Sequence, residues 1–139
     1  MEADTNRDDI AVERRGDGSL LLRSRLTLAP VARSLPHLFD ASAARWPQRQ
    51  FMRQRQEGVQ GGWRSIGYVE AARQSRAIAQ WLLDQGAVPG EVIVALSGPS
   101  IEHALLTLAT QRVRMALAPL STGYSLLSQD HLKLTACVK

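Results

Sequence analysis

Several polar segments of this sequence carry side chains that could do chemistry, and each also has an ordinary structural explanation. Ser97-Gly98-Pro99-Ser100 lies between an expected strand and an expected helix. Free N–H groups and the helix dipole at such a junction favour anions, so this segment could contact a phosphate or a nucleotide. It has a single glycine and lacks the G-x-G-x-x-G pattern of dinucleotide-binding turns. We therefore interpret it as an ordinary turn in which Ser100 caps the helix.

The histidines and the single cysteine do not converge on one site along the sequence. His103 could serve as a catalytic or pH-sensitive group, but its place in the first turn of a helix favours a ring that faces solvent or bonds to a loop. His37 and His131 stand alone and far apart, which argues against a metal site. Cys137 has no basic partner in view, so we exclude it as a nucleophile. We assign no catalytic and no metal-binding residue.

Two further sets of residues could contact a ligand. Ser121-Thr122-Gly123-Tyr124 is polar and follows the carboxyl end of an expected strand, where the ligands of α/β proteins gather. A ligand contact and a structural turn both fit that position. Trp46, Trp63 and Trp81 could form an aromatic cage, but we expect them to pack in the core and against a hairpin.

The elements that must position these residues follow from turn signals and hydrophobic periodicity. Glycines beside Asp17 favour a tight connection in the first hairpin. The expected elements, in order, are a hairpin of 10–15 and 19–25, a helix capped by Ser34 and stopped by Pro47, a hairpin of 50–56 and 63–66, a helix of 68–85, a strand of 91–96, a helix from Ser100 to about Val113, a strand of 115–120, and a short helix from Ser125 or Ser128.

Helical spacing also predicts which side chains share a face. In the helix that starts after Ser34, the shared face is expected to hold Leu38, Phe39, Ser42 and Trp46. The long helix is expected to bury a stripe of Tyr68, Ala71, Ala72, Ser75, Ile78, Ala79, Leu82 and Leu83. Glu70 should reach back to the N–H of Gly67, and Gly86 should close the helix in a left-handed conformation.

The strand–helix–strand order over residues 91–120 predicts a βαβ unit with parallel strands and a right-handed crossover. The near-continuous apolar run of the first strand is typical of a strand covered on both faces. Two parallel strands do not make a finished layer, so we expect the first portion of a larger domain, from a truncated reading frame or a fragment. The expected fold class is α/β with an incomplete sheet.

Composition limits the kinds of protein this chain can be. It has 139 residues, 45% of them hydrophobic and 22% charged, which is ordinary globular usage and excludes a disordered tail. One cysteine excludes a disulfide framework. No apolar run approaches the roughly 20 residues of a membrane span, and the opening residues lack a signal-peptide pattern. We therefore expect a cytoplasmic protein with no membrane partner.

The formal net charge of +4 does not by itself indicate a nucleic-acid partner. The arginines are scattered, and no basic run is longer than the pair Arg14-Arg15. Aromatic residues are not interleaved with them in the way that base stacking needs. A solvated basic surface is the favoured interpretation, and we expect no nucleic acid to bind.

The ordered set of segments resembles the N-terminal region of the adenylate-forming, or AMP-binding, acyl- and aryl-CoA synthetases. The resemblance extends from about Val12 to Leu134. It is carried by 35–47 (LxxLFxxxAxxxP), by Trp63, Arg64, Ile66, Tyr68 and Glu70, by Leu82, Leu83, Gly86, Gly90 and Val92, and by 97–109 and 118–134. The wording VERRGDGSLLLRS, IEHALL and YSLLSQD is most similar to the feruloyl-CoA synthetase branch.

The resemblance implies an organisation and a reaction. Residues 1–33 would be an N-terminal extension with a hairpin, 34–134 part of the AMP-binding domain, and 135–139 an unmatched tail. The family joins a carboxylic acid to coenzyme A through an acyl-adenylate, using ATP and Mg²⁺. In that family the loop at 121–124 mostly packs the core, which favours its structural interpretation. A homodimer is compatible with the resemblance.

The family's adenylation motifs are absent from this chain. No Ser/Thr/Gly-rich loop with a lysine occurs, and the two lysines, Lys133 and Lys139, have no such context. We therefore carry over no catalytic or cofactor-binding residue and expect the chain alone to bind none of ATP, Mg²⁺ and coenzyme A. The sequence predicts the N-terminal part of an ATP-dependent acid–CoA ligase for hydroxycinnamates such as ferulate, inactive alone. The alternative is a non-catalytic remnant or interaction module.

Two positions and one four-residue stretch depart from the family pattern. Gly67 stands where the family usually has Thr or Ser as a helix cap, and Pro99 where it commonly has Asn. Arg112-Val113-Arg114-Met115 replaces a stretch that usually contains Gly-Ala or Gly-Val before a strand. This last change places charge near an expected buried turn.

Overall fold

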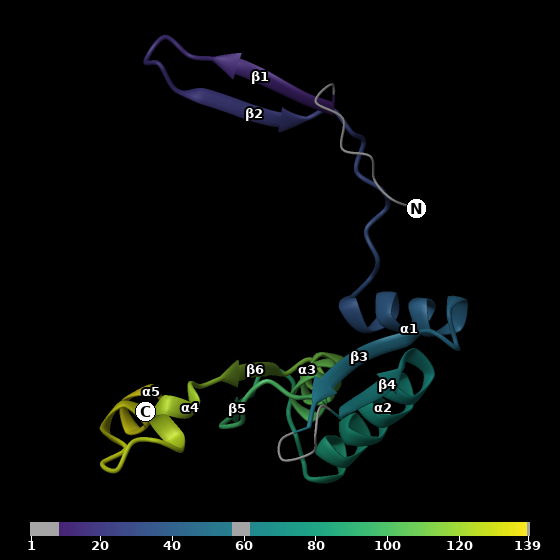
Figure 1. Ribbon diagram of the computed structural model, residues 1–139, viewed down its shortest axis with the longest axis vertical. Coiled ribbons are helices and arrows are strands. Elements are labelled where there is room, and N and C mark those ends of the chain that lie inside the picture. Colours follow the sequence, from purple (N-terminus) through teal and green to yellow (C-terminus); the bar gives the residue numbers. More distant parts are fainter. Residues whose placement is uncertain (1–8, 57–61, 139) are drawn as a thin grey trace. The chain divides into compact units, whose positions relative to one another are not determined.

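The computed structural model describes residues 9–56 and 62–138 (Figure 1). The chain divides into two compact units, Met1–Val31 and Ala32–Lys139. In the first unit, β1 (Ile10–Arg14) pairs with β2 (Leu20–Ser24) antiparallel. Gly18 has φ +86°, and its N–H donates to the Arg15 carbonyl at 3.0 Å. The predicted first hairpin is therefore confirmed.

The second unit begins with α1 (Leu35–Arg45), which the Ser34 side chain caps by accepting from the N–H of His37. Pro36 lies in the first turn, where its missing N–H costs no helical hydrogen bond. The buried face consists of Pro36, Phe39 and Ala43. The predicted shared face was therefore partly wrong, because Leu38 points outward and is 52% exposed.

The second hairpin leads directly into the long helix. Strands β3 (Gln50–Arg55) and β4 (Trp63–Gly67) pair antiparallel, and α2 (Tyr68–Asp84) starts at the next residue. Phe39 of α1 lies edge-on to Phe51 of β3, with ring centroids 4.8 Å apart, and Tyr68 is within 5.5 Å of both. Contacts among these three rings pack the β3–β4 hairpin against α1 and α2.

Helix α2 buries most of the predicted stripe, with Ala71, Ala72, Ser75, Ala79 and Leu82 enclosed. Leu83, which was expected in it, is exposed. The helix ends as predicted at Gly86, where φ is +84°. The N–H of Ala87 bonds the Leu82 carbonyl and that of Gly86 the Leu83 carbonyl, at 3.0 and 2.9 Å, which is a Schellman motif.

The expected contact between Glu70 and the Gly67 N–H is replaced by pairing along the helix. The Glu70 carboxylate accepts from Arg73 Nε at 2.8 Å and from Gln74 Nε2 at 2.6 Å. The hydrogen bonds from Arg73 and Gln74 lower the pKa of Glu70 to about 2. Donors one turn ahead compete better for this carboxylate than a single backbone N–H behind it.

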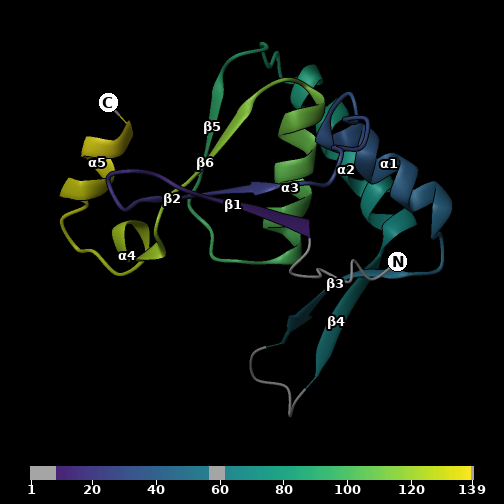
Figure 2. The ribbon, with the colours of Figure 1, turned by 90° about the horizontal axis from the view of Figure 1, so that it is seen from above.

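The predicted βαβ unit is present in the second half of the chain. Strands β5 (Val92–Ala95) and β6 (Ala116–Pro119) pair parallel, and α3 (Ile101–Arg112) connects them (Figure 2). Only one face of β5 is covered: Ala95 is buried, whereas Val92 on the other face is 57% exposed. The predicted cover on both faces is thus missing from the described chain.

Two short helices follow β6. They are α4 (Thr122–Ser125) and α5 (Leu132–Val138), so the predicted start of a short helix at Ser125 or Ser128 was wrong. Ser121 caps α4 by accepting from the N–H of Gly123 at 3.2 Å. None of the helices in the described residues is long and apolar enough to cross a membrane.

Buried side chains form two neighbouring clusters, in which small residues of α2 allow α3 to approach closely. One holds Phe39, Ala43, Ile66, Ala71, Ala72, Ile101 and Leu105, and the other Ala79, Leu82, Ala109, Val113 and Met115. The tryptophans are outside both: Trp46, Trp63 and Trp81 are 38, 55 and 58% exposed. Their expected place in the core was wrong, although Trp63 lies under the Arg53 guanidinium on its hairpin.

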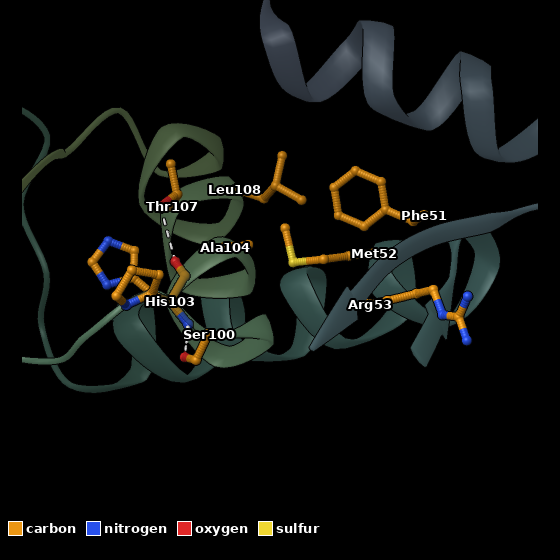
Figure 3. A pocket seen from close by; sticks show the side chains of 9 residues that line it. Phe51, Met52, Arg53, Ser100, His103, Ala104, Thr107 and Leu108 are labelled. Carbon is orange, nitrogen blue, oxygen red and sulfur yellow. Dashed lines mark hydrogen bonds between the residues drawn. The ribbon is translucent and has the colours of Figure 1, made fainter. Parts of the chain in front are cut away.

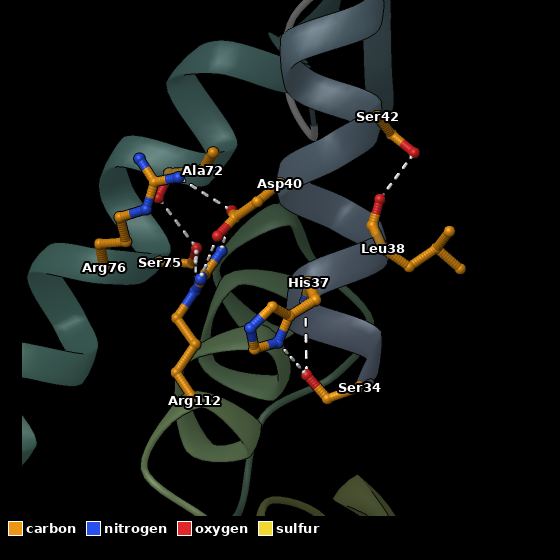
Figure 4. Close-up of polar contacts among 9 residues, drawn as sticks. All are labelled: Ser34, His37, Leu38, Asp40, Ser42, Ala72, Ser75, Arg76 and Arg112. Atoms are coloured by element: carbon orange, nitrogen blue, oxygen red, sulfur yellow. Dashed lines mark hydrogen bonds and ion pairs between the residues drawn. The ribbon is translucent and has the colours of Figure 1, made fainter. Parts of the chain in front are cut away.

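A polar network joins the three main helices (Figure 4). Arg112 of α3 donates from both terminal nitrogens to Asp40 of α1, at 2.9 and 2.6 Å, and from Nε to the Ser75 hydroxyl of α2 at 3.2 Å. Arg76 of α2 also contacts Asp40, at 3.0 Å. The Arg112 side chain is only 12% exposed, so the charge that the sequence placed near a buried turn is paired there.

The same segment contains a strained residue. Arg114 follows α3, within the stretch where the family that the sequence resembles usually has Gly-Ala or Gly-Val, and it has φ 59°. A side chain in this left-handed region crowds its own backbone, which costs about 1–2 kcal/mol. The backbone accepts this conformation because it lets the Arg114 carbonyl receive the N–H of Gly90 at 2.9 Å.

We expect Asp40→Asn to destabilise the chain by about 1–3 kcal/mol at pH 7, because Arg112 then loses its counter-charge in a largely buried place. The hydrogen bond from Arg112 holds the pKa of Asp40 below its usual value. A lowered folded-state pKa gives stability that is full above about pH 4 and is lost as the pH falls through the folded value. Urea unfolding from pH 2 to 7 should therefore show the two curves converging at acid pH. Asp84→Asn, on an exposed face of α2, is the matched control and should stay parallel to the wild type.

We expect Arg114→Gly to stabilise the chain by about 1 kcal/mol, because glycine adopts positive φ without strain. Arg114→Ala should give no such gain, since alanine keeps the Cβ. Arg33→Gly, at an exposed position with ordinary φ, is the control for simple loss of an arginine and should be neutral or destabilising. Thermal unfolding followed by far-UV circular dichroism measures all three. Equal melting temperatures for Arg114→Gly and the wild type would contradict the strain.

Candidate functional site at the carboxyl ends of the parallel strands

The polar segments singled out from the sequence meet at one end of the βαβ unit. The turn after β5 and the turn after β6 lie side by side: a Cβ added to Gly98 would lie 3.7 Å from the Thr122 methyl group. Between them is a cleft of about 390 Å³. Its lining consists of Ser97, Gly98, Pro99, His103, Pro119, Leu120, Ser121 and Thr122. Two of the predicted candidate segments and one predicted histidine therefore share one site.

A serine–histidine pair is the most chemically capable feature of this cleft. The Ser97 hydroxyl lies 3.1 Å from Nδ1 of His103. His103 is fixed in the first turn of α3, where its backbone N–H donates to the Ser100 hydroxyl at 3.0 Å and its carbonyl accepts from Thr107 Oγ1 at 2.9 Å. Of the two settings expected for the His103 ring, solvent or a loop contact, the structure has the contact with the loop residue Ser97. The predicted cap of α3 by Ser100 is confirmed.

A second groove lies on the other side of the start of α3 (Figure 3). It has a volume of about 580 Å³ and is mainly apolar, with Phe51 and Met52 of β3 facing Leu108 of α3. The Gln54 side chain accepts from the N–H of Ile101 at 3.0 Å, and Arg64 of β4 is paired with Glu102. These contacts hold the hairpin against the amino end of α3.

The groups in the cleft limit the chemistry that it can do alone. A nucleophilic serine needs a base that a third group orients, with donors aimed at the developing oxyanion. No carboxylate within the described residues is hydrogen-bonded to the His103 ring. The cleft lining has hydroxyls and one imidazole but neither a cation nor a carboxylate, so it does not fit the phosphates of ATP with Mg²⁺. The arrangement is that of a capped βα turn.

The remaining candidates are spread over other places in the second unit. His37 lies 2.7 Å from the Ser34 hydroxyl at the start of α1, and Nδ1 of His131 lies 3.4 Å from the Tyr124 carbonyl. Cys137 is exposed on α5. Across residues 9–56 and 62–138 no group of three or more potential metal ligands comes together.

Sequence reasoning missed the contacts that join distant segments. Asp40 and Arg112 are 72 positions apart, and Gln54 lies 47 positions from the helix start that it contacts. The one available signal was the arginine pair in a stretch where the family has glycine. It indicated a charge near the turn but not the partner that neutralises it.

Comparison with known proteins identifies the fold and the family. The AMP-binding enzyme family matches residues 39–133. A hybrid PKS-NRPS synthetase 1 of Dothistroma septosporum is 31% identical over 106 residues, or 76% of this chain. Among solved structures, the N-terminal subdomain of Klebsiella oxytoca NpsA with 3-hydroxybenzoyl-AMSN matches 66% of this chain with TM-score 0.58 and 24% identity. A fatty acyl-adenylate ligase from L. pneumophila with acyl adenylate and pyrophosphate matches 69%, with TM-score 0.60 and 19% identity.

The hairpin, α1, α2 and the βαβ unit therefore make up the fold of the N-terminal subdomain of adenylate-forming enzymes. Because the family match covers more than half of the sequence, the chain belongs to the AMP-binding enzyme family. It spans 2% of the synthetase, 21% of the NpsA subdomain and 17% of the acyl-adenylate ligase. The predicted AMP-binding family and the α/β fold class with incomplete sheets are confirmed, whereas the feruloyl-CoA synthetase branch stays a prediction.

If this turn is structural, its two serines should differ in their effect on stability. Ser100→Ala removes the cap of α3 and should cost about 1 kcal/mol. Ser97→Ala removes one exposed hydrogen bond and should cost about 0.5 kcal/mol or less. Ser65→Ala is the control, because Ser65 is exposed on β4 and its hydroxyl has no hydrogen-bond partner within the described residues. Chemical denaturation of the three variants tests this, and a larger loss for Ser97 than for Ser100 would contradict it.

Proposed function

We propose that this chain is the N-terminal part of an ATP-dependent acid–CoA ligase that activates a hydroxycinnamate such as ferulate. The enzyme would form an acyl-adenylate and pyrophosphate, and the thiol of coenzyme A would then displace AMP. Membership of the AMP-binding family is the observation that carries carboxylate adenylation. The transfer to coenzyme A and the aromatic acid rest on the sequence resemblance in VERRGDGSLLLRS, IEHALL and YSLLSQD.

The open side of the βαβ unit supports a role as part of a larger domain. Val92 and Leu96 leave apolar surface uncovered on one face of β5, at 57 and 43% exposure. Parallel sheets are normally covered on both faces, because their strands are apolar on both sides. We propose that further chain of an AMP-binding domain covers this face.

The cleft formed by the described residues does not provide the phosphate chemistry of that reaction. Adenylation needs donors and cations that stabilise charge on the transferred phosphoryl group. The cleft at the carboxyl ends of β5 and β6 offers Ser97, His103, Ser121 and Thr122 instead. We therefore propose that ATP, Mg²⁺ and coenzyme A are held by residues outside this segment, and that residues 1–139 alone are inactive.

A non-catalytic interaction module is the second candidate. The observation that favours it is the same cleft. Its polar groups are a helix cap and a serine–histidine pair, and no carboxylate within the described residues orients the histidine for catalysis. Such a chain would keep the fold of the subdomain and act by binding.

The experiment is ATP–pyrophosphate exchange with ferulate, with the chain 1–139 alone and with a polypeptide continued through the coding sequence that follows Lys139. We expect exchange in the longer polypeptide only. Acetate, which lacks the aromatic group, is the matched acid control. Formation of the coenzyme A thioester, with release of AMP, on adding coenzyme A then distinguishes ligation from adenylation alone.

Each outcome decides between the candidates. Exchange with ferulate followed by thioester formation supports the ligase. Exchange without thioester would leave an adenylating enzyme and contradict the transfer to coenzyme A. Exchange in neither polypeptide, with cooperative unfolding of both, would contradict the ligase and favour the interaction module.

A further inference from the structure

The carboxyl end of α3, opposite to the Ser97–His103 cleft, carries excess positive charge. A groove of about 420 Å³ lies there between the start of α1 and the end of α3. Arg33, Arg112 and Arg114 line it, together with His37. Figure 4 shows His37 on the side of α1 that faces Arg112.

The acidic side chain in this groove is already neutralised. Asp40 is engaged by two nitrogens of Arg112, at 2.9 and 2.6 Å, and by Arg76 at 3.0 Å. Within residues 9–56 and 62–138, the guanidinium groups of Arg33 and Arg114 contact neither an acid nor a hydrogen-bond acceptor. Two arginines that line one groove therefore keep unpaired guanidinium groups, whose forked donors suit a carboxylate or a phosphate.

One lining side chain shows which kind of anion would fit. Oε1 of Gln111 is buried and has no hydrogen-bond partner within the described chain. A buried acceptor without a donor is unfavourable, and this one adjoins a groove that could hold the donor. Carboxylates and sulfate carry no hydrogen at neutral pH, whereas a protonated phosphate group has an O–H.

The negative end of the α3 dipole disfavours an anion in this groove, and hydrogen bonds to two of its last carbonyls reduce that effect. The carbonyls of Thr110 and Gln111, at the negative end of α3, accept from the N–H groups of Met115 and Arg114 at 2.9 and 3.4 Å. The amino end of α1, with Ser34 as its cap, also lines the groove, and its dipole favours negative charge.

We propose that this groove binds a protonated phosphate group, from inorganic phosphate or a phosphate monoester. Arg33 and Arg114 donate to its charged oxygens, and a rotation of the Gln111 side chain toward the groove lets the now buried Oε1 accept from its O–H. The proposal explains why an arginine is found at the strained position 114: its backbone carries φ 59° while its side chain lines the groove. It does not rest on the ligase activity, because the site lies at the other end of α3.

Isothermal titration calorimetry of the chain 1–139 at pH 6.5 and constant ionic strength tests this, with inorganic phosphate and ribose 5-phosphate as probes. Sulfate is the probe control, since it has the charge but no O–H. The variants are Arg33→Gln and Arg114→Gly, and Arg55→Gln on β3 is the control for loss of one exposed arginine. We expect saturable phosphate binding that weakens at least about fivefold in each groove variant and less than about twofold in Arg55→Gln. The tighter of the two phosphate probes identifies the source.

Thermal unfolding separates binding from folding. Arg114→Gly should melt higher than the wild type without anion but gain less from added phosphate, and a variant that merely unfolds cannot do both. Absence of saturable binding by either phosphate probe would overturn the proposal. So would sulfate binding as tight as phosphate binding, or equal weakening in Arg55→Gln.

Discussion

The pairing of Arg112 with Asp40 is the constraint on which the arrangement of the helices depends. Arg112 is at the end of α3, Asp40 is in the middle of α1, and Ser75 and Arg76 of α2 complete the contacts. A guanidinium that is 12% exposed must keep its counter-charge. The three helices therefore cannot shift along one another without leaving a charge unpaired. Apolar contacts alone would tolerate such a shift.

Small side chains make that network possible. Ala71, Ala72 and Ser75 on α2 are almost completely buried, as is Ala109 on α3. Because these residues are short, the two helices approach closely enough for the Ser75 hydroxyl to reach Nε of Arg112 at 3.2 Å. Larger residues at these positions would separate the helices and break the polar contacts, so packing and charge pairing depend on each other here.

Much of the fold could be predicted because its signals are local. The glycine turn of the first hairpin, the Ser34 and Ser100 caps, the stripe of α2 and the left-handed Gly86 each depend on residues within a few positions. The failures lie where distant segments decide. Leu38 and the tryptophans are exposed because no neighbouring helix of the described chain packs against them. The spacing of residues along one helix does not show which of its faces another helix will cover.

The candidate site shows the same division. Sequence order placed Ser97, Ser100 and His103 near one helix start, and the pairing of β5 with β6 brought Ser121 and Thr122 to them. The positive charges that could bind an anionic ligand are instead at the opposite end of α3. There Asp40, 72 positions away in the sequence, pairs with Arg112. Position at the carboxyl ends of parallel strands is thus insufficient evidence of a phosphate site in this protein. The excess of unpaired cations, rather than the topology, decides where an anion is stabilised.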